Sequence, residues 1–350
     1  MIRKITVLAL LLGAAYVPAL ADYEVVTSTH GNLILSGYAI GRYTYVQGDP
    51  EVPGNEATST FSLRSASLIF HGDIFKYAGY CILVDGVASP ALIDGFGTLN
   101  VIPNTEFKMG QFLVPFSRES CTSTSKLLLI DRTAVSTAIA PPLGRDVGAQ
   151  FEYSLKPEGK PYWGAFALAG INGAGPNTAD DNRAKDVALR VMGNPCPWED
   201  FAPLTLEGYY YFGRPELGMG VDATGRRYGV AAAFDHERFT VQTEYLGREV
   251  TVDFAGVETS ISAGGYYLQA SYKHPLPWEW LQIVEPAARF ESFDPNDSQP
   301  DDGVGAITGG VNLHFDPGHH CKFMANYERV TEEGPDVDND VISGQFQIRF

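Results

Sequence analysis

The chain ends on the segment Ile342-Ser-Gly-Gln-Phe-Gln-Ile-Arg-Phe350. Successive side chains of an extended strand point to opposite faces, so Phe346, Ile348 and Phe350 share one face and the polar residues between them share the other. The same alternation recurs in two earlier segments, Phe239–Tyr245 and Val311–Phe315. This pattern is typical of strands in an outer-membrane β-barrel, which have lipid on one side and water on the other.

Alternating runs of this kind occur along the whole chain and predict sixteen strands. They are expected at residues 31–47, 58–73, 77–87, 91–101, 105–114, 144–156, 162–171, 184–193, 204–212, 225–234, 239–249, 260–273, 282–293, 305–315, 320–331 and 341–350. An even number is what a single-chain bacterial barrel requires. After the first 21 residues no segment approaches about 20 consecutive apolar residues, so a helical membrane span is excluded there. The sequence therefore predicts an all-β fold, a transmembrane antiparallel β-barrel of sixteen strands.

The connections between these strands alternate in length. If both termini lie in the periplasm, the even-numbered connections lie there too, and several of them are tight turns, such as Asp73–Lys76 and Asp235–Arg238. Odd-numbered connections are often long and acidic, such as Asp294–Val304 and Glu332–Asp340. A soluble sandwich has no reason to sort its loops in this way, so the sorting favours a porin-like barrel.

The first 21 residues are interpreted as a signal peptide. Arg3 and Lys4 precede the apolar run Ile5–Leu12, and Ala19-Leu20-Ala21 supplies small residues for cleavage. A membrane anchor is the alternative, although the run is short for a spanning helix. The barrel is expected over residues 22–350. Export leads to an oxidising compartment, but the sequence cannot assign disulfides among the four cysteines, Cys81, Cys121, Cys196 and Cys321.

The third outer connection, residues 115–143, is the longest in the chain. A connection of this length in a compact fold is usually functional. A sixteen-stranded barrel encloses an aqueous channel, which must be narrowed if it is to select among solutes. We therefore expect this loop to fold inward and form the constriction. The alternative is that it covers the outer mouth.

Several ordered segments resemble one family of outer-membrane proteins, the phosphate-selective porin O and P family. The segments are Lys108–Glu119, Thr122–Ser125, Ile130–Arg132, Gly144–Gly148, Tyr228–Ala233, Val241–Tyr245, Gly265–Tyr272 and Gly309–Leu313. The resemblance implies a trimeric, water-filled porin with an inward third loop and basic residues along the lumen. It further implies a location in the bacterial outer membrane, in contact with its lipid and lipopolysaccharide.

Anion selectivity requires fixed positive charge where a pore is narrow, and arginine can bind two phosphate oxygens at once. The residues expected at the constriction or beside it are Arg64, Lys108, Arg118, Glu119, Lys126, Asp131, Arg132 and Arg145. By strand alternation, Arg42, Arg289 and Lys322 are also candidates for the lumen. Acids stand beside these bases, so a general or weakly selective porin remains an alternative to a phosphate channel.

The net charge of −17 is unusual for an anion pore, but its distribution matters more than its total. Six of the expected outer connections hold 18 acidic residues, so most of the negative charge is placed outside the pore. These loops are interpreted either as sites that bridge lipopolysaccharide phosphates through divalent cations or as a solvated surface. The acidic balance disfavours nucleic acid as a partner.

Other classes of function find less support in the sequence. No Gly-x-Ser-x-Gly segment and no grouping of a nucleophile with a base indicates an enzyme. His319-His320-Cys321 is interpreted as a turn and strand start, because neighbouring strand residues point to opposite faces, and no metal or cofactor is expected. A non-porous structural or adhesive barrel is the main alternative. The prediction is therefore a porin for passive diffusion of small hydrophilic solutes or ions, which include anions such as phosphate.

Overall fold

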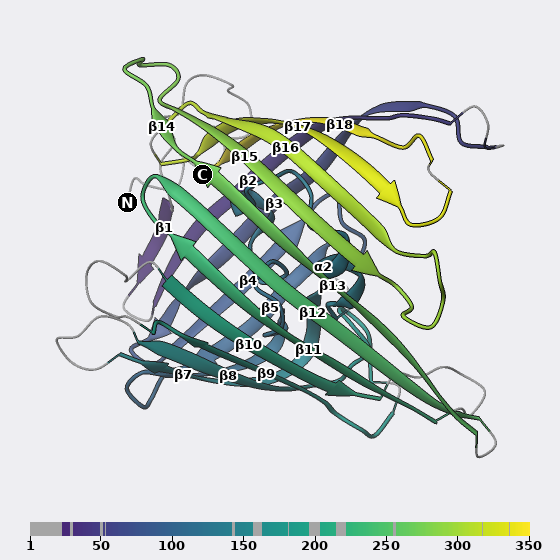
Figure 1. Ribbon diagram of the computed structural model, residues 1–350. Coiled ribbons are helices and arrows are strands. Elements are labelled where there is room, and N and C mark those ends of the chain that lie inside the picture. The colour runs from purple at the N-terminus through teal and green to yellow at the C-terminus, as the bar shows by residue number, and fades with distance from the viewer. Residues whose placement is uncertain are drawn as a thin grey trace.

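The computed structural model describes residues 23–350 except for 29–30, 50–51, 53, 142–143, 157–162, 181, 196–203, 215–221, 255–256, 317 and 336. Sixteen antiparallel strands close into a barrel (Figure 1). They are β2 (Gly31–Val46), β3 (Thr58–Phe75), β4 (Ala78–Asp85), β5 (Leu92–Leu99), β6 (Thr105–Leu113), β7 (Arg145–Leu155), β8 (Gly164–Ile171), β9 (Asp186–Gly193), β10 (Leu204–Gly213), β11 (Asp222–Asp235), β12 (Phe239–Phe254), β13 (Val257–Tyr272), β15 (Ile283–Asp294), β16 (Val304–His314), β17 (Cys321–Glu332) and β18 (Val341–Arg349). The predicted fold class and strand number are confirmed.

The C-terminal strand closes the barrel against the first long strand. β18 pairs with β2 from Val341 opposite Val46 to Arg349 opposite Tyr38. Beyond that register, the Phe350 N–H donates to the Gly37 carbonyl at 2.9 Å, and the Gly37 N–H donates to the Phe350 carbonyl at 2.8 Å. The end of the barrel that carries the C-terminus is called the turn end below, and the opposite end is called the loop end.

Two short strands were not predicted. β1 (Tyr23–Ser28) pairs with the start of β2, along the part of that edge that β18 does not reach. β14 (His274–Pro275) continues the pairing of β13 along β15 at the turn end. The expected signal segment 1–21 lies outside the described residues.

The hairpin of β12 and β13 is longer than predicted. Its strands were predicted at residues 239–249 and 260–273, whereas the pairing of β12 with β13 continues to Phe254 opposite Val257. In Figure 1 this hairpin projects at the loop end, as the β2–β3 hairpin also does. Its outer part carries Thr251 and Ser260, whose hydroxyls bond across the strands at 2.8 Å. Apolar and polar residues still alternate there, with Val250 opposite Ile261 and Thr251 opposite Ser260, so the predicted bounds ended both strands too early.

The two faces of the wall differ in polarity. Ile307 and Val230 point outward and are 61% and 60% exposed, and the aromatic residue Phe346 is 45% exposed on the same outer face. The neighbours of these residues on the strands point inward; Thr308 and Gln345 are buried. Among the described residues no helix is long and apolar enough to cross a membrane.

Candidate functional site

The connection between β6 and β7 enters the barrel. It contains a short 3₁₀ helix, η1 (Thr124–Lys126), and one α-helical turn and a half, α2 (Ala134–Ile139), which lies amid the strands in Figure 1. Thr133 begins α2 as its N-cap, because its hydroxyl accepts the Ser136 N–H at 3.2 Å. The part described, residues 114–141, is called the inner loop below.

Apolar side chains hold the inner loop against one side of the wall. Phe116, Val135 and Ile139 are fully buried, and they join a cluster with inward-facing residues of β8 to β13, including Tyr211 and Tyr267. Burial of each such side chain contributes about 1.5–3 kcal/mol relative to exposure. The inner loop thus covers apolar wall residues that would otherwise line a watery lumen.

Ion pairs and hydrogen bonds hold the beginning of the inner loop to the same wall. The Arg118 guanidinium binds the carboxylates of Glu207 on β10 and Asp235 at the end of β11. Glu244 on β12 accepts the backbone N–H of Arg118 at 2.8 Å and the Ser117 hydroxyl at 3.2 Å. Arg118 is therefore fixed to the wall rather than extended into open space.

Glu119 acts within the loop. Its carboxylate accepts the Thr133 N–H at 2.9 Å, the Thr133 hydroxyl at 2.6 Å and the Ser136 hydroxyl. It also lies 3.9 Å from the guanidinium of Arg289 on β15. This buried carboxylate joins the first turn of the inner loop to the start of α2, so it is not exposed to a passing solute.

The middle of the inner loop bonds to the opposite side of the barrel. The Leu128 carbonyl accepts the Asn312 amide of β16 at 2.9 Å, and the Ser125 carbonyl accepts the Gln347 amide of β18 at 3.0 Å. A third carbonyl, of Leu127, accepts the ammonium of Lys322 on β17 at 3.4 Å.

Asp131 extends this contact to β2 and β15. Its carboxylate binds the Arg42 guanidinium through two hydrogen bonds, one of 2.7 Å. Its carbonyl accepts the Arg289 guanidinium at 2.7 Å. The inner loop therefore crosses the lumen between two sides of the wall, and Arg42, Arg289 and Lys322 all face inward.

Three arginines gather on the side of the lumen formed by β2 to β7. Arg64 is exposed at a β-bulge in β3, where it is the extra residue between the pairs of Leu63 and Ser65. Arg132 of the inner loop donates to the carbonyls of Glu119, at 3.3 Å, and Thr122. The nearby charges that act on Arg132 include those of Glu119, Arg64 and Arg145. Arg64, Arg132 and Arg145 are called the arginine group below.

Carboxylates neutralise part of this positive charge. Arg145 donates to Asp94 of β5 at 2.8 Å. Lys108 lies 3.3 Å from Glu106, and its ammonium stands over the Phe96 ring at 4.9 Å from the centroid. Among the described residues, Arg64 and Arg132 make no ion pair within 4 Å.

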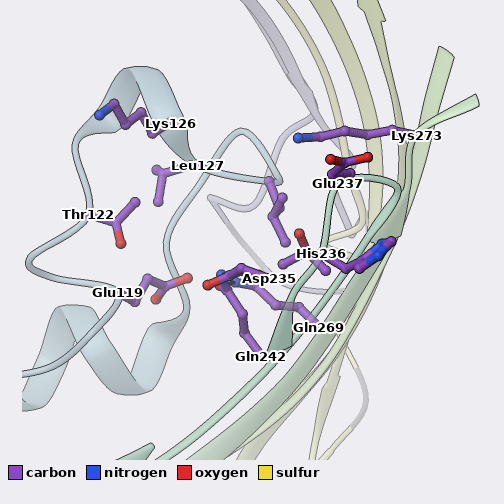
Figure 2. A pocket seen from close by; sticks show the side chains of 12 residues that line it. Glu119, Thr122, Lys126, Leu127, Asp235, His236, Glu237, Gln242, Gln269 and Lys273 are labelled. Atoms are coloured by element: carbon purple, nitrogen blue, oxygen red, sulfur yellow. Dashed lines mark hydrogen bonds between the residues drawn. The ribbon is translucent and has the colours of Figure 1, made fainter. Parts of the chain in front are cut away.

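Lys126 lies in a different part of the lumen. It is exposed at the end of η1 and lines a cavity of about 400 Å³ between the inner loop and the turn ends of β11 to β13. Figure 2 shows loop residues such as Thr122 on one side of this cavity, and Asp235, Gln269 and Lys273 on the other. The eight predicted residues thus do not form one site.

Sequence reasoning missed the wall carboxylates that hold the inner loop, Glu207, Glu244 and Glu291. Strand alternation places these acids on the polar, inward face, because their outward-facing neighbours include Leu206, Tyr245 and Phe290, but it does not show that they bind the inner loop. Within the described part of the chain, no group of three or more His, Cys, Asp or Glu side chains could hold a metal ion. Cys81, Cys121 and Cys321 are free, and Cys196 lies outside the described residues.

The fold resembles solved outer-membrane porins. The anion-selective porin from Comamonas acidovorans has a TM-score of 0.66 and 14% identity, over 91% of this chain and 100% of that one. The channel DcaP of Acinetobacter baumannii has a TM-score of 0.65 and 13% identity, over 95% and 100%. OmpF of Salmonella typhi has a TM-score of 0.63 and 12% identity, over 94% and 100%. At these identities the likeness establishes the fold.

Comparison of the amino-acid sequence gives two further matches, one to a single relative and one to a family model. An uncharacterized protein of Aquifex aeolicus is 26% identical over 283 residues, which are 69% of this chain and 63% of that protein. The match thus spans less than two thirds of that relative's length. The fold is that of a porin-type β-barrel. The model of one family, phosphate-selective porin O and P, matches residues 215–350. The resemblance found in the sequence is confirmed over β11 to β18; the inner loop precedes this match.

Proposed function

We propose that the protein is a passive diffusion channel for small hydrophilic solutes and ions, and that the inner loop forms its constriction. The observation that carries the proposal is the path of this loop, which is bonded to β10–β13 on one side and to β15–β18 and β2 on the other. Solutes would pass between the loop and the wall of β2 to β7.

A preference for anions follows from the charges along that passage. The arginine group offers guanidinium groups from three separate segments, and Arg64 and Arg132 are not neutralised by an ion pair among the described residues. A guanidinium can replace part of the water lost by an anion in a narrow pore, and its planar fork suits the oxygens of phosphate. The Comamonas porin of similar fold is described as anion-selective.

The test is single-channel recording in planar bilayers with a salt gradient. The wild-type channel is expected to open and to show a reversal potential of the sign that anion preference requires. Arg132→Gln should move that potential toward the cation side, because it removes one of the two arginines of this group that make no ion pair among the described residues. Lys185→Gln is the matched control, since Lys185 pairs with Asp180 in the outer connection before β9.

Two results would contradict the proposal in different ways. Cation preference of the wild-type channel would rule out the selectivity assigned to the arginine group. An absence of openings from correctly folded protein would rule out the channel itself and favour a structural or adhesive barrel.

We further infer export of the chain, with removal of residues 1–21, and assembly into a homotrimer. OmpT of Vibrio cholerae, which shares the fold at a TM-score of 0.59, has been described in a trimer form. The acidic outer connections would then face lipopolysaccharide, with divalent cations between carboxylates and lipid phosphates. Crosslinking of the protein in outer-membrane fractions would show a trimer band if the assembly is as proposed.

A further inference from the structure

Two histidine rings meet at the turn end of the barrel. His314 is the last residue of β16, and His319 belongs to the turn that leads into β17. Their Nδ1 atoms are 2.8 Å apart, and the rings are perpendicular to within 16°, with centroids separated by 4.5 Å. His319 therefore contacts His314 of β16 rather than its sequence neighbour His320, whose ring binds Asp316.

The orientation of His314 is fixed by a buried carboxylate. Its Nε2 atom lies 2.8 Å from Glu285 of β15. Glu285 also accepts the Ser271 hydroxyl at 2.7 Å and the Asn312 amide at 3.3 Å, so its own position is determined. A carboxylate bound at Nε2 keeps the proton there and leaves the Nδ1 lone pair free. This is the arrangement that orients histidine ligands in metal sites.

The second histidine is held in an uncommon conformation. His319 has φ +57°, in the left-handed region that non-glycine residues seldom occupy. Such strained backbone conformations are concentrated at functional sites. The turn is fixed around it by Asp316, which accepts the N–H groups of His320 at 3.1 Å and Cys321 at 2.7 Å. His320 is occupied by Asp316 at its own Nδ1 atom, so it does not join the pair.

We propose that His314 and His319 form a binding site for a divalent copper ion through their Nδ1 atoms. Ligand nitrogens about 2.0–2.1 Å from a metal are roughly 3.3 Å apart in tetrahedral geometry and about 2.9 Å apart at the right angle of a square-planar centre. The observed 2.8 Å fits the right angle. Imidazole nitrogens in tetragonal geometry favour Cu²⁺, which also stands highest in the affinity order of divalent first-row metals.

Copper would change the tautomer of His319 at this site. Without metal, a proton on the Nδ1 atom of His319 can be donated to the lone pair of His314. With metal, both Nδ1 atoms are ligands, neutral His319 carries its proton on Nε2, and water completes the coordination. His319 is half-buried, so the ion can reach the pair from the solvent at the turn end. The site does not depend on the proposed channel activity.

The experiment is a titration of the purified full chain, in detergent micelles, with Cu²⁺. Isothermal calorimetry measures the binding, and electron paramagnetic resonance identifies the ligands of the bound ion. One equivalent per chain is expected, with a tetragonal signal showing coupling to two nitrogen atoms. His319→Asn should abolish this site, because asparagine tolerates the left-handed conformation and keeps the turn but lacks the imidazole. His320→Asn is the matched control and should bind copper as the wild type does.

A second variant addresses the orienting carboxylate. Glu285→Gln should weaken binding by roughly 10–100-fold, the usual effect of losing a partner of a metal-bound histidine. Circular dichroism of each variant establishes that the barrel is folded. The proposal is overturned if His319→Asn binds copper as tightly as the wild type, or if His320→Asn removes the two-nitrogen signal and His319→Asn does not.

Discussion

Arg118 illustrates at the residue scale why a charge inside a barrel need not meet the solute. The alternation of neighbouring residues predicts only that basic side chains reach the lumen. The structure pairs Arg118 with Glu207, 89 residues away, and Arg145 with Asp94, 51 residues away. Within the arginine group, Arg64 and Arg132 are the members without an ion pair among the described residues. Under the proposed anion preference, such unpaired bases would act on a passing solute.

Arg118→Met tests the role of these pairs in holding the loop. Loss of hydrogen bonds to two carboxylates should lower the free energy of unfolding by roughly 1.5–3 kcal/mol and make the open channel noisier. The barrel should still fold, because Glu207 keeps its bonds to Arg190 at 2.6 and 2.9 Å. Urea unfolding in lipid vesicles and single-channel recording measure the two effects.

Lys185→Met serves as the control for Arg118→Met. The side chain of Lys185 is 51% exposed, and exposed ion pairs contribute about 0–1 kcal/mol. Equal noise in the two variants would show that Arg118 does not restrain the inner loop.

At the scale of elements, the inner loop supplies the buried apolar contacts inside the barrel. Residues 114–141 bury apolar side chains against β8–β13 and donate or accept bonds across the lumen. The inner loop can approach the wall closely at β16 because the residue there is a glycine, Gly310. A Cβ atom at Gly310 of β16 would lie 3.0 Å from Leu129 Cδ2 and 2.4 Å from Asn326 Oδ1.

Deletion of Thr122–Ala140 tests whether the inner loop is the constriction. Removal of this segment should increase single-channel conductance, because it takes away the part that crosses the lumen. Deletion of residues 334–339 in the outer connection before β18 is the control and should change conductance little. Unchanged conductance in the first variant would show that the inner loop does not limit flow.

Gly310→Ala provides a finer test of how the loop packs. The added methyl group should displace the side chains of Leu129 and Asn326 and increase current noise. Gly309→Ala is the matched control, because no atom lies within 4 Å of a Cβ at that neighbouring position. If both variants behave like the wild type, the contact of Leu129 with β16 does not hold the loop in place.

At the scale of the whole molecule, the barrel presents apolar side chains outward and polar ones inward. Val230 of β11 is 60% exposed on the outer face, whereas Gln242 on the adjacent β12 lines the cavity inside. The same substitution should therefore have different effects on the two faces if lipid surrounds the barrel.

Val230→Arg should destabilise the barrel by about 2–4 kcal/mol in vesicles, the range measured for arginine at the middle of a bilayer. Gln242→Arg should cost much less, because its side chain enters a wet cavity beside Asp235. Urea unfolding in vesicles gives both values. Equal losses for the two variants would contradict the orientation of the wall.

The sequence by itself determined the class of fold and most of the strands. All sixteen predicted segments became barrel strands, because lipid outside and water inside impose an alternation that is local and can be read residue by residue. The final strand fits this rule: Phe346, Ile348 and Phe350 point outward, and β18 pairs with β2. The outer part of the β12–β13 hairpin follows the same alternation, although the predicted strands ended at residue 249 and resumed at residue 260.

The tertiary structure alone decided which lumen residues act together. Arg64, Arg132 and Arg145 come from three segments and meet only when the barrel closes and the inner loop crosses it. The same holds for Asp131 with Arg42 and for His314 with Glu285. Alternation gives the face on which a residue lies, but a pair also depends on the strand register and on the path of the loop. These are set by contacts between segments far apart in the sequence, so a local pattern could not reveal them.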